Sequence, residues 1–124
     1  MGPRTLLVVD DDPAFLEFVR RIVEDAPQSV RCLTATDGTE ALALVRSERP
    51  QLVLLDLMMP VPDGWEVARK LKADPATSAT HVVAITGHVM PGDREQALAT
   101  GFDDYITKPV DVRSVRELLR TYLG

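Results

Sequence analysis

The chain has 124 residues, of which 45% are hydrophobic and 27% are charged, and its formal net charge is −5. This length fits one domain that buries a core of its own. Acidic and basic residues are interspersed, so no long basic tract is available to follow a nucleic-acid backbone or to bind anionic lipid, and we expect neither direct nucleic-acid binding nor membrane binding.

The cysteine content and the start of the chain predict a cytoplasmic protein. The single cysteine, Cys32, cannot form an internal disulfide, and no charged segment followed by a long apolar stretch opens the chain. Met1 and Gly2 match the start of a myristoylation signal, but Leu6 stands where that signal requires Ser or Thr. We therefore expect one domain over residues 1–124, without a lipid anchor.

Strands and helices are predicted to alternate strictly along the chain. Short apolar runs predict five strands, at Leu6–Val9, Val30–Ala35, Leu52–Leu55, Val82–Ile85 and Tyr105–Thr107. The five helices are predicted to begin after Asp12, Asp37 and Gly64, to run from Pro91 to Gly101, and to cover Val112–Tyr122.

Apolar side chains recur at helical spacing in three of the predicted helices, and we expect them to face the core. They are Phe15, Phe18, Val19, Ile22 and Val23 in the first helix, Val67, Ala68 and Leu71 in the third, and Val112, Val115, Leu118, Leu119 and Tyr122 in the last.

This pattern predicts an α/β fold. Short continuous apolar runs are typical of strands buried on both faces of a parallel sheet, and a five-fold strand–helix alternation gives right-handed crossovers. We expect a doubly wound, five-stranded parallel sheet with five helices distributed over its two faces. Periodicity alone does not determine the strand order.

Four of the five apolar runs end in polar residues that suit phosphoryl chemistry. Asp10 and Asp11 follow the first run, Asp56 the second of the four, Thr86 the next and Lys108 the last. Ligands of such sheets bind outside the carboxyl ends of the strands, so these side chains are expected to converge. Three neighbouring carboxylates repel one another unless a cation lies between them, and hard oxygen ligands favour Mg²⁺.

Together these residues resemble the receiver domains of bacterial two-component response regulators. The segments that carry the resemblance are Val8–Asp11, Leu55–Pro60, Asp63–Gly64, Thr86 and Asp104–Pro109. The resemblance covers essentially the whole chain. It implies a flavodoxin-like sheet with strand order 2-1-3-4-5 and a phosphoacceptor switch rather than an enzyme.

The resemblance also implies a role for each candidate site residue. Asp56 is the implied nucleophile that accepts the phosphoryl group, Lys108 neutralises charge on that group, and Thr86 donates a hydrogen bond to it. The implied Mg²⁺ ligands are Asp11, Asp56, the backbone carbonyl of Met58 and, directly or through water, Asp10.

Two residues match the positions that convert phosphorylation into a change of shape in this family. Thr86 is implied to move inward and the ring of Tyr105 to turn inward with it, although ordinary packing of a strand aromatic is an alternative for Tyr105. Gly87 stands where the family usually has alanine, and it loosens this loop. The implied output face is the fourth helix, fifth strand and fifth helix, including Asp104, Tyr105 and Arg116.

Met58 and His88 are implied to flank the phosphoryl group and to set its lifetime. Met58 cannot orient an attacking water and would shield the group. Three interpretations of His88 stay open: a solvated loop residue, a hydrogen-bond donor that keeps water away, and a general base. We favour shielding, and with it a comparatively persistent phosphorylated state.

The implied partners are a sensor histidine kinase or a histidine phosphotransfer protein and an unidentified downstream protein, and the chain is expected to be a monomer or a weak phosphorylation-dependent dimer. The main alternative is a receiver-like interaction module that works without phosphorylation. A haloacid-dehalogenase-like phosphatase does not fit the run Asp10–Pro13, and a flavodoxin-like electron carrier would have to bring a flavin phosphate against three aspartates.

Overall fold

The structure, a computed structural model, describes residues 4–124. Five parallel strands form one sheet in the order β2-β1-β3-β4-β5, which confirms the predicted fold class and strand order. The strands are β1 (Arg4–Val9), β2 (Val30–Ala35), β3 (Leu52–Asp56), β4 (His81–Thr86) and β5 (Asp104–Thr107), and the helices are α1 (Pro13–Asp25), α2 (Gly38–Glu48), α3 (Gly64–Ala73), α4 (Asp93–Thr100) and α5 (Val112–Leu123).

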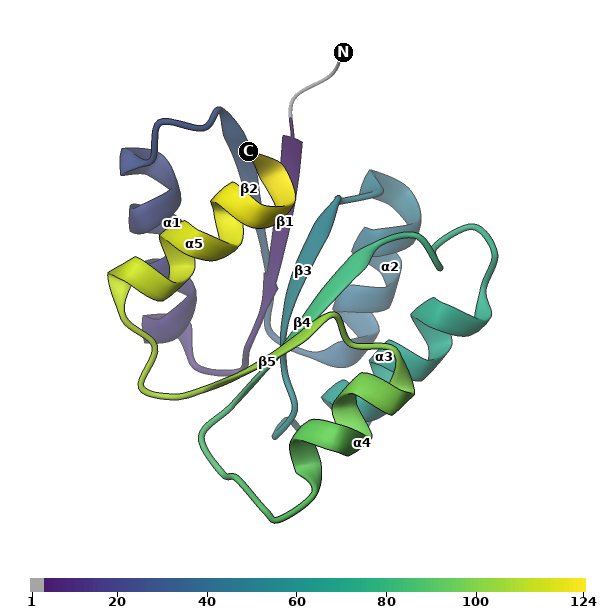
Figure 1. Cartoon of the computed structure of the whole chain (residues 1–124). Coiled ribbons are helices and arrows are strands. Elements are labelled where there is room, and N and C mark those ends of the chain that lie inside the picture. The colour runs from purple at the N-terminus through teal and green to yellow at the C-terminus, as the bar shows by residue number, and fades with distance from the viewer. Residues whose placement is uncertain (1–3) are drawn as a thin grey trace.

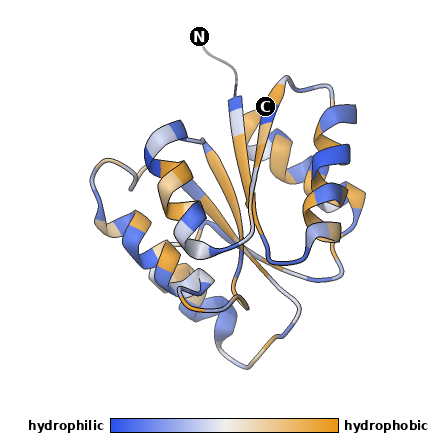
Figure 2. Cartoon of the chain, turned by 180° about the vertical axis from the view of Figure 1, so that it is seen from behind, coloured by the Kyte–Doolittle hydropathy of each residue, from blue (hydrophilic) through white to orange (hydrophobic). Residues whose placement is uncertain are grey.

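The helices cover both faces of the sheet. Helices α1 and α5 pack on one face, and α2, α3 and α4 pack on the other (Figure 1). In Figure 2 the strands are mostly hydrophobic, whereas the helices alternate between hydrophobic and hydrophilic residues. Within residues 4–124 no helix is long and apolar enough to cross a membrane. Met1 and Gly2, on which the expectation about a lipid anchor partly rests, lie outside the described residues.

Burial along the strands follows their place in the sheet. Every residue of β3 is buried, as are the last five residues of β1 and of β4, whereas the edge strands β2 and β5 are only partly buried. Inner strands covered on both faces have no solvated side and so read as continuous apolar runs. The polar residues of the inner strands therefore stand near the strand ends, with Arg4, Thr5 and His81 at the amino ends and Asp56 and Thr86 at the carboxyl ends.

Aspartates begin four of the five helices. Each accepts a hydrogen bond from a backbone N–H of the first turn, at 2.7–3.0 Å, and these capping residues are Asp12, Asp37, Asp63 and Asp111. The prediction that the fourth helix begins at Pro91 is wrong. Gly92 lies in the left-handed region with φ 86°, which breaks the helical path, and α4 begins at Asp93 without a side-chain cap.

The predicted inner faces are correct for α3 and, apart from Val112, for α1 and α5, because Phe15, Phe18 and Tyr122 pack against the core while only partly buried. Val67, Ala68 and Leu71 are buried, but Phe15 and Phe18 are only half-buried and Val112 is exposed. The buried positions that the prediction omits are Leu16 in α1 and Leu123 in α5. Phe15 and Val112 lie in the first turns of their helices, close to the edge of the sheet that carries the acidic residues, where Phe15 is half-buried against the core and Val112 is exposed.

One glycine fixes how closely α3 approaches the end of β3. A Cβ atom at Gly64 would lie 2.4 Å from the backbone oxygen of Asp56 and 2.8 Å from the Cα atom of Leu57. Contacts this short with backbone atoms cannot be relieved by turning a side chain. By contrast, a Cβ atom at Gly87 would meet only the Lys108 side chain, at 3.9 Å.

We expect Gly64→Ala to destabilise the protein by about 2–3 kcal/mol, because the helix must move away from the strand. Gly87→Ala is the matched control: its φ is not in the left-handed region, so we expect a change within about 1 kcal/mol, in the stabilising direction. Urea unfolding followed by circular dichroism measures both values. Equal effects of the two substitutions would contradict this assignment of the close contact.

Candidate functional site

Three carboxylates meet at the carboxyl ends of β1 and β3. One carboxylate oxygen each of Asp10, Asp11 and Asp56 lies within 4.8 Å of the other two, and we call these residues the acidic cluster. Asp10 and Asp56 are buried and Asp11 is exposed. The sheet therefore brings together residues that are 46 positions apart in the chain, as the sequence predicts for Asp10 and Asp56.

Lys108, directly after β5, supplies the positive charge that faces this cluster. Its Nζ atom lies 2.7 Å from Oδ2 of Asp10, to which it donates a hydrogen bond, and 3.8 Å from Oδ2 of Asp56. Burial lowers the pKa of the Lys108 ammonium, but the hydrogen bond to Asp10 and the negative charges of Asp10 and Asp56 outweigh this effect and raise it. Lys108 is therefore cationic at neutral pH.

The two buried carboxylates are in different electrostatic environments. Both oxygens of Asp10 accept a hydrogen bond, Oδ1 from the backbone N–H of Asp12 at 2.9 Å and Oδ2 from Lys108. Burial raises the pKa of Asp56, as do the charges of Asp10 and Asp11, against the opposing effects of the Met58 N–H and of Lys108. Asp56 is the carboxylate whose negative charge is less fully compensated.

These donor patterns bear on which oxygens could hold a cation. Oδ1 of Asp56 accepts a hydrogen bond from the backbone N–H of Met58 at 2.9 Å, and Oδ2 of Asp56 faces Lys108. Within residues 4–124 the Asp11 carboxylate takes part in no hydrogen bond, so its oxygens are available. The cluster offers only oxygen ligands, among them the exposed carboxylate of Asp11 and the buried carboxylate of Asp56, whose charge is not fully compensated. Such a set of ligands fits a hard divalent cation. Asp10, already bound twice, fits a ligand that acts through water.

The Thr86 hydroxyl is close to the cluster in the fold but makes other contacts. Thr86 is the last residue of β4 and is buried. Its Oγ1 donates to the backbone oxygen of His88 and accepts from the backbone N–H of His88, each at 3.1 Å. The hydroxyl can donate to a group on Asp56 only after it leaves the His88 oxygen, so the loop after β4 must rearrange with it.

A cavity of about 370 Å³ opens beside the cluster. It is lined by Asp56, Met58, Gly87, His88 and Lys108, and the Met58 side chain is exposed. The cavity thus joins the predicted nucleophile to both residues predicted to flank it. Both flanking positions face one space, although their effect on a bound group stays a prediction.

Tyr105 lies apart from this cavity, on β5, and its ring is already buried. Its hydroxyl is buried without a hydrogen-bond partner among the described residues. Burial raises the pKa of this phenol, and the nearby Asp93 raises it further. The backbone oxygen of Tyr105 accepts a 3.2 Å hydrogen bond from Arg94, which ties α4 to β5.

The sequence analysis missed one neighbour of Lys108. The Nζ atom of Lys108 lies 4.6 Å from the centre of the Phe15 ring. Phe15 continues the apolar spacing of α1, so the pattern placed it in the core. Only its position, three residues after the capping Asp12 and beside the acidic loop, indicates that it belongs to the site.

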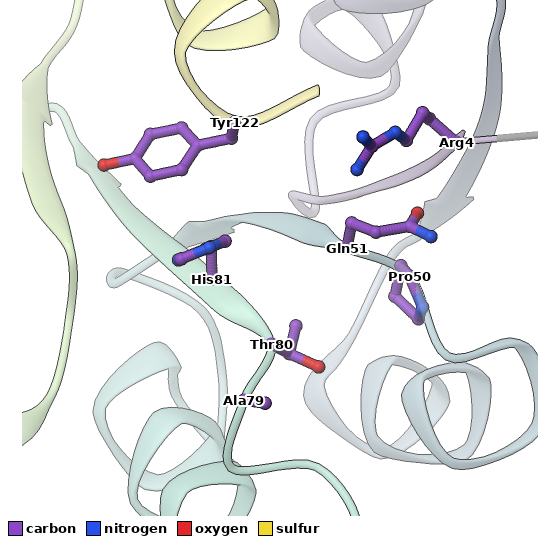
Figure 3. Close-up of a pocket in the computed structure, with 7 residues that line it drawn as sticks. All are labelled: Arg4, Pro50, Gln51, Ala79, Thr80, His81 and Tyr122. Atoms are coloured by element: carbon purple, nitrogen blue, oxygen red, sulfur yellow. The ribbon is translucent and has the colours of Figure 1, made fainter. Parts of the chain in front are cut away.

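A second hollow lies at the opposite edge of the sheet, near the amino ends of β1 and β4 (Figure 3). Arg4, Gln51, His81 and Tyr122 point into it, and the His81 and Tyr122 ring centres are 5.0 Å apart. His81 is exposed, and its Nδ1 lies 3.5 Å from Oδ1 of Asp103. This hollow and the acidic cluster lie at opposite ends of the strands.

Known proteins resemble this chain over most of its length. The sequence profile of the response regulator receiver domain matches residues 6–120. The chain is 33% identical over 122 residues to the polar-differentiation response regulator DivK of Brucella anthropi, which covers 98% of each protein.

Solved structures share the fold. The chemotaxis protein CheY4 of Vibrio cholerae gives a TM-score of 0.86 at 26% identity, covering 98% of this chain and 100% of that one. The Mn²⁺-bound form of the response regulator Rcp1 gives a TM-score of 0.88 at 25% identity, covering 98% of this chain and 96% of that one.

The raised pKa of Asp56 predicts a pH-dependent loss of stability in metal-free protein. As the pH rises from the ordinary aspartate pKa through the raised pKa of the folded state, the unfolded chain releases its proton first and stability falls. Above the folded-state pKa the loss is complete. Asp56→Asn removes this loss of stability, so in EDTA at neutral pH we expect the variant to have a higher melting temperature than the wild type. In a domain of this size, each kcal/mol of stability corresponds to roughly 4 °C in the melting temperature.

The difference between Asp56→Asn and wild type should vanish below the ordinary aspartate pKa, and MgCl₂ should raise the melting temperature of the wild type more than that of the variant. Asp11→Asn, which alters an exposed carboxylate, is the matched control and should gain less in EDTA. A variant that melts below wild type in EDTA at neutral pH contradicts the prediction.

Proposed function

The chain belongs to the response regulator receiver domain family, and from this we propose that it is the phosphoacceptor switch of a two-component or phosphorelay system, with Asp56 as the acceptor. The observation that carries the proposal is the environment of Asp56. Its carboxylate is buried, borders a cavity, lies within 4.8 Å of two other carboxylates and has its Oδ2 3.8 Å from Lys108. We assign this function to one domain over residues 1–124.

In the proposed reaction a carboxylate oxygen of Asp56 attacks the phosphorus of a phosphohistidine or an acyl phosphate. A P–O bond to Asp56 forms, and the P–N bond of the phosphohistidine or the P–O bond of the acyl phosphate breaks. With phosphohistidine, the electrons of the P–N bond stay on the imidazole, which takes up a proton from solvent. With an acyl phosphate, the electrons of the P–O bond leave with the carboxylate of the acyl group. The product is an aspartyl phosphate, and the chain acts as a signalling switch rather than as a conventional enzyme.

Asp11, Asp56 and the Met58 carbonyl would hold Mg²⁺, and Asp10 would assist through water. When bound, the cation supplies Lewis-acid neutralisation of charge on the phosphoryl oxygens. The chain's own contribution is Lys108, whose ammonium lies between Asp10 and Asp56 and has to move only a short way to reach a group on Asp56. Thr86 adds a donor once it leaves His88.

The weak attachment of α4 supports the proposal that phosphorylation acts on the α4–β5–α5 face. Only Ala97 of α4 is buried, and the helix lacks a side-chain cap. Arg94 ties it to β5 through the Tyr105 oxygen and through Asp104, at 3.8 Å. A helix with so little buried apolar surface opens at low cost, so inward movement of Thr86 can shift it. Tyr105 is the proposed switch aromatic.

Met58 and His88 are proposed to set the lifetime of the aspartyl phosphate, because both line the cavity beside Asp56. An exposed thioether at Met58 shields the group from water and cannot activate water. The proposed partners are a sensor histidine kinase or a histidine phosphotransfer protein in the cytoplasm, and a downstream protein that reads the α4–β5–α5 face. The alternative is an interaction module that works without phosphorylation.

The first test is phosphorylation by acetyl phosphate, read out by intact-protein mass. We expect wild type to gain one phosphoryl group in MgCl₂ and none in EDTA, and Asp56→Asn to gain none. Lys108→Met should slow the reaction about 100-fold, as loss of a transition-state donor does. Lys70→Met, an exposed lysine outside the cavity, is the matched control and should react at the wild-type rate. An unmodified wild type under all these conditions supports the interaction-module alternative instead.

The second test is whether the signal reaches the output face. Beryllofluoride mimics the phosphoryl group on Asp56, so amide resonances should shift around the cavity and also in α4, β5 and α5, including Asp104, Tyr105 and Arg116. ¹⁵N–¹H spectra of wild type and of Asp56→Asn, which cannot form the adduct, separate specific shifts from those of the reagent. Shifts confined to the loops around Asp56 would mean that this face is not coupled to the site.

A further inference from the structure

The Lys108 ammonium has three neighbours that attract it. Asp10 lies at 2.7 Å, Asp56 at 3.8 Å, and the face of the Phe15 ring at 4.6 Å from its centre. A cation within about 6 Å of an aromatic ring centre is attracted by the negative face of the ring. About a quarter of the Lys108 side chain, 26%, remains exposed, so water is the competitor of all three neighbours.

The position of the Phe15 ring is fixed by the start of α1. The capping Asp12 accepts from the N–H of Ala14 at 3.0 Å, and its backbone oxygen accepts from the N–H of Phe15 at 3.1 Å. Phe18, one helical turn further on, packs against the Phe15 ring with 6.2 Å between the ring centres. The ring therefore belongs to the first turn that directly follows Asp10 and Asp11 of the acidic cluster.

We infer that Phe15 is a positioning residue, whose ring face keeps the Lys108 ammonium at the boundary between Asp10 and Asp56. The inference rests on the proposed function, in which Lys108 must release Asp10 to reach a group on Asp56. A ring face offers no single lone pair that fixes the ammonium at one point, so attraction persists while the ammonium moves from one carboxylate toward the other. An aliphatic side chain of similar size packs equally well but does not attract the ammonium, so that only Asp10 and water stabilise the ammonium as it begins to move.

The expected consequence is kinetic. Phe15→Leu should lower the rate constant for phosphorylation by acetyl phosphate about 2–5-fold, the range that corresponds to an exposed or half-buried cation–aromatic contact. Phe15→Tyr keeps a ring face and should retain the wild-type rate. Acetyl phosphate is used as the donor because it needs no protein docking surface on α1.

Three controls separate positioning from a merely structural effect. The Mg²⁺ concentration at half-maximal rate should be unchanged in Phe15→Leu, because Asp10, Asp11 and Asp56 are untouched. In a Lys108→Met background, Phe15→Leu should have no further effect. Progressive fluorination of the Phe15 ring, which weakens the negative face at nearly constant shape, should lower the rate in steps.

A Phe15→Leu protein that reacts at the wild-type rate overturns the inference, and so does a rate deficit that persists in the Lys108→Met background. If wild type accepts no phosphoryl group, the proposed function fails. Urea unfolding of wild type, Phe15→Leu, Lys108→Met and the double variant then tests whether the Phe15 ring and the Lys108 ammonium interact. Non-additive effects of Phe15→Leu and Lys108→Met on stability then support the ring–ammonium contact, and additive effects overturn it.

Discussion

The contact between Lys108 and Asp10 is the interaction on which the rest of the site depends. It joins the residue after β5 to the residue after β1 across 2.7 Å, over the ends of β3 and β4 that lie between them in the sheet. Burying Asp10 and Asp56 side by side is unfavourable without a cation, since each carboxylate loses water and repels the other. Lys108 is the cation that the chain itself provides.

The same contact makes the two buried aspartates unequal. Asp10 receives the hydrogen bond from Lys108 and another from the Asp12 N–H, while Lys108 reaches Asp56 only at 3.8 Å. Asp56 therefore holds the less compensated negative charge, next to a cavity that can admit a phosphodonor. A buried carboxylate with an accessible oxygen and a nearby cation suits nucleophilic attack better than a carboxylate, such as that of Asp10, whose two oxygens both accept hydrogen bonds. Asp10 and Asp56 are the same type of residue, and their different suitability for attack follows from their different hydrogen bonding and charge compensation.

Stability is distributed unevenly around the site. The acidic cluster stands on β1 and β3, whose residues are almost all buried, and Gly64 lets α3 pack directly against the end of β3. On the other side, α4 buries one residue and depends on the Arg94 contacts with β5. An acidic cluster on well-buried strands beside a weakly held helix is an arrangement in which a small change at Thr86 can alter a distant surface, because the helix has little packing to oppose it.

Local sequence patterns determined most of the fold. The fully buried strands read as apolar runs, and the aspartates Asp12 and Asp37 marked the starts of the first two helices, because both signals depend on neighbours within a few residues. The convergence of Asp10, Asp56 and Lys108 was predictable for a related reason: parallel strands deliver their carboxyl ends to one edge. The start of α4 was misjudged at Pro91, since Gly92 has a left-handed backbone inside a turn that the hydrogen bond from the Asp93 N–H to the Met90 oxygen closes, and apolar spacing does not report such a turn.

Only the tertiary structure decided which partner each side chain has. Periodicity assigned Phe15 to the core, yet its ring lies over the Lys108 ammonium, on a strand end 93 positions away. Thr86 was placed at the right strand end, but its hydroxyl bonds to His88 rather than pointing at Asp56. Sequence spacing specifies the direction and burial of a side chain within its own element, whereas partners across elements depend on how helices and strands pack in three dimensions.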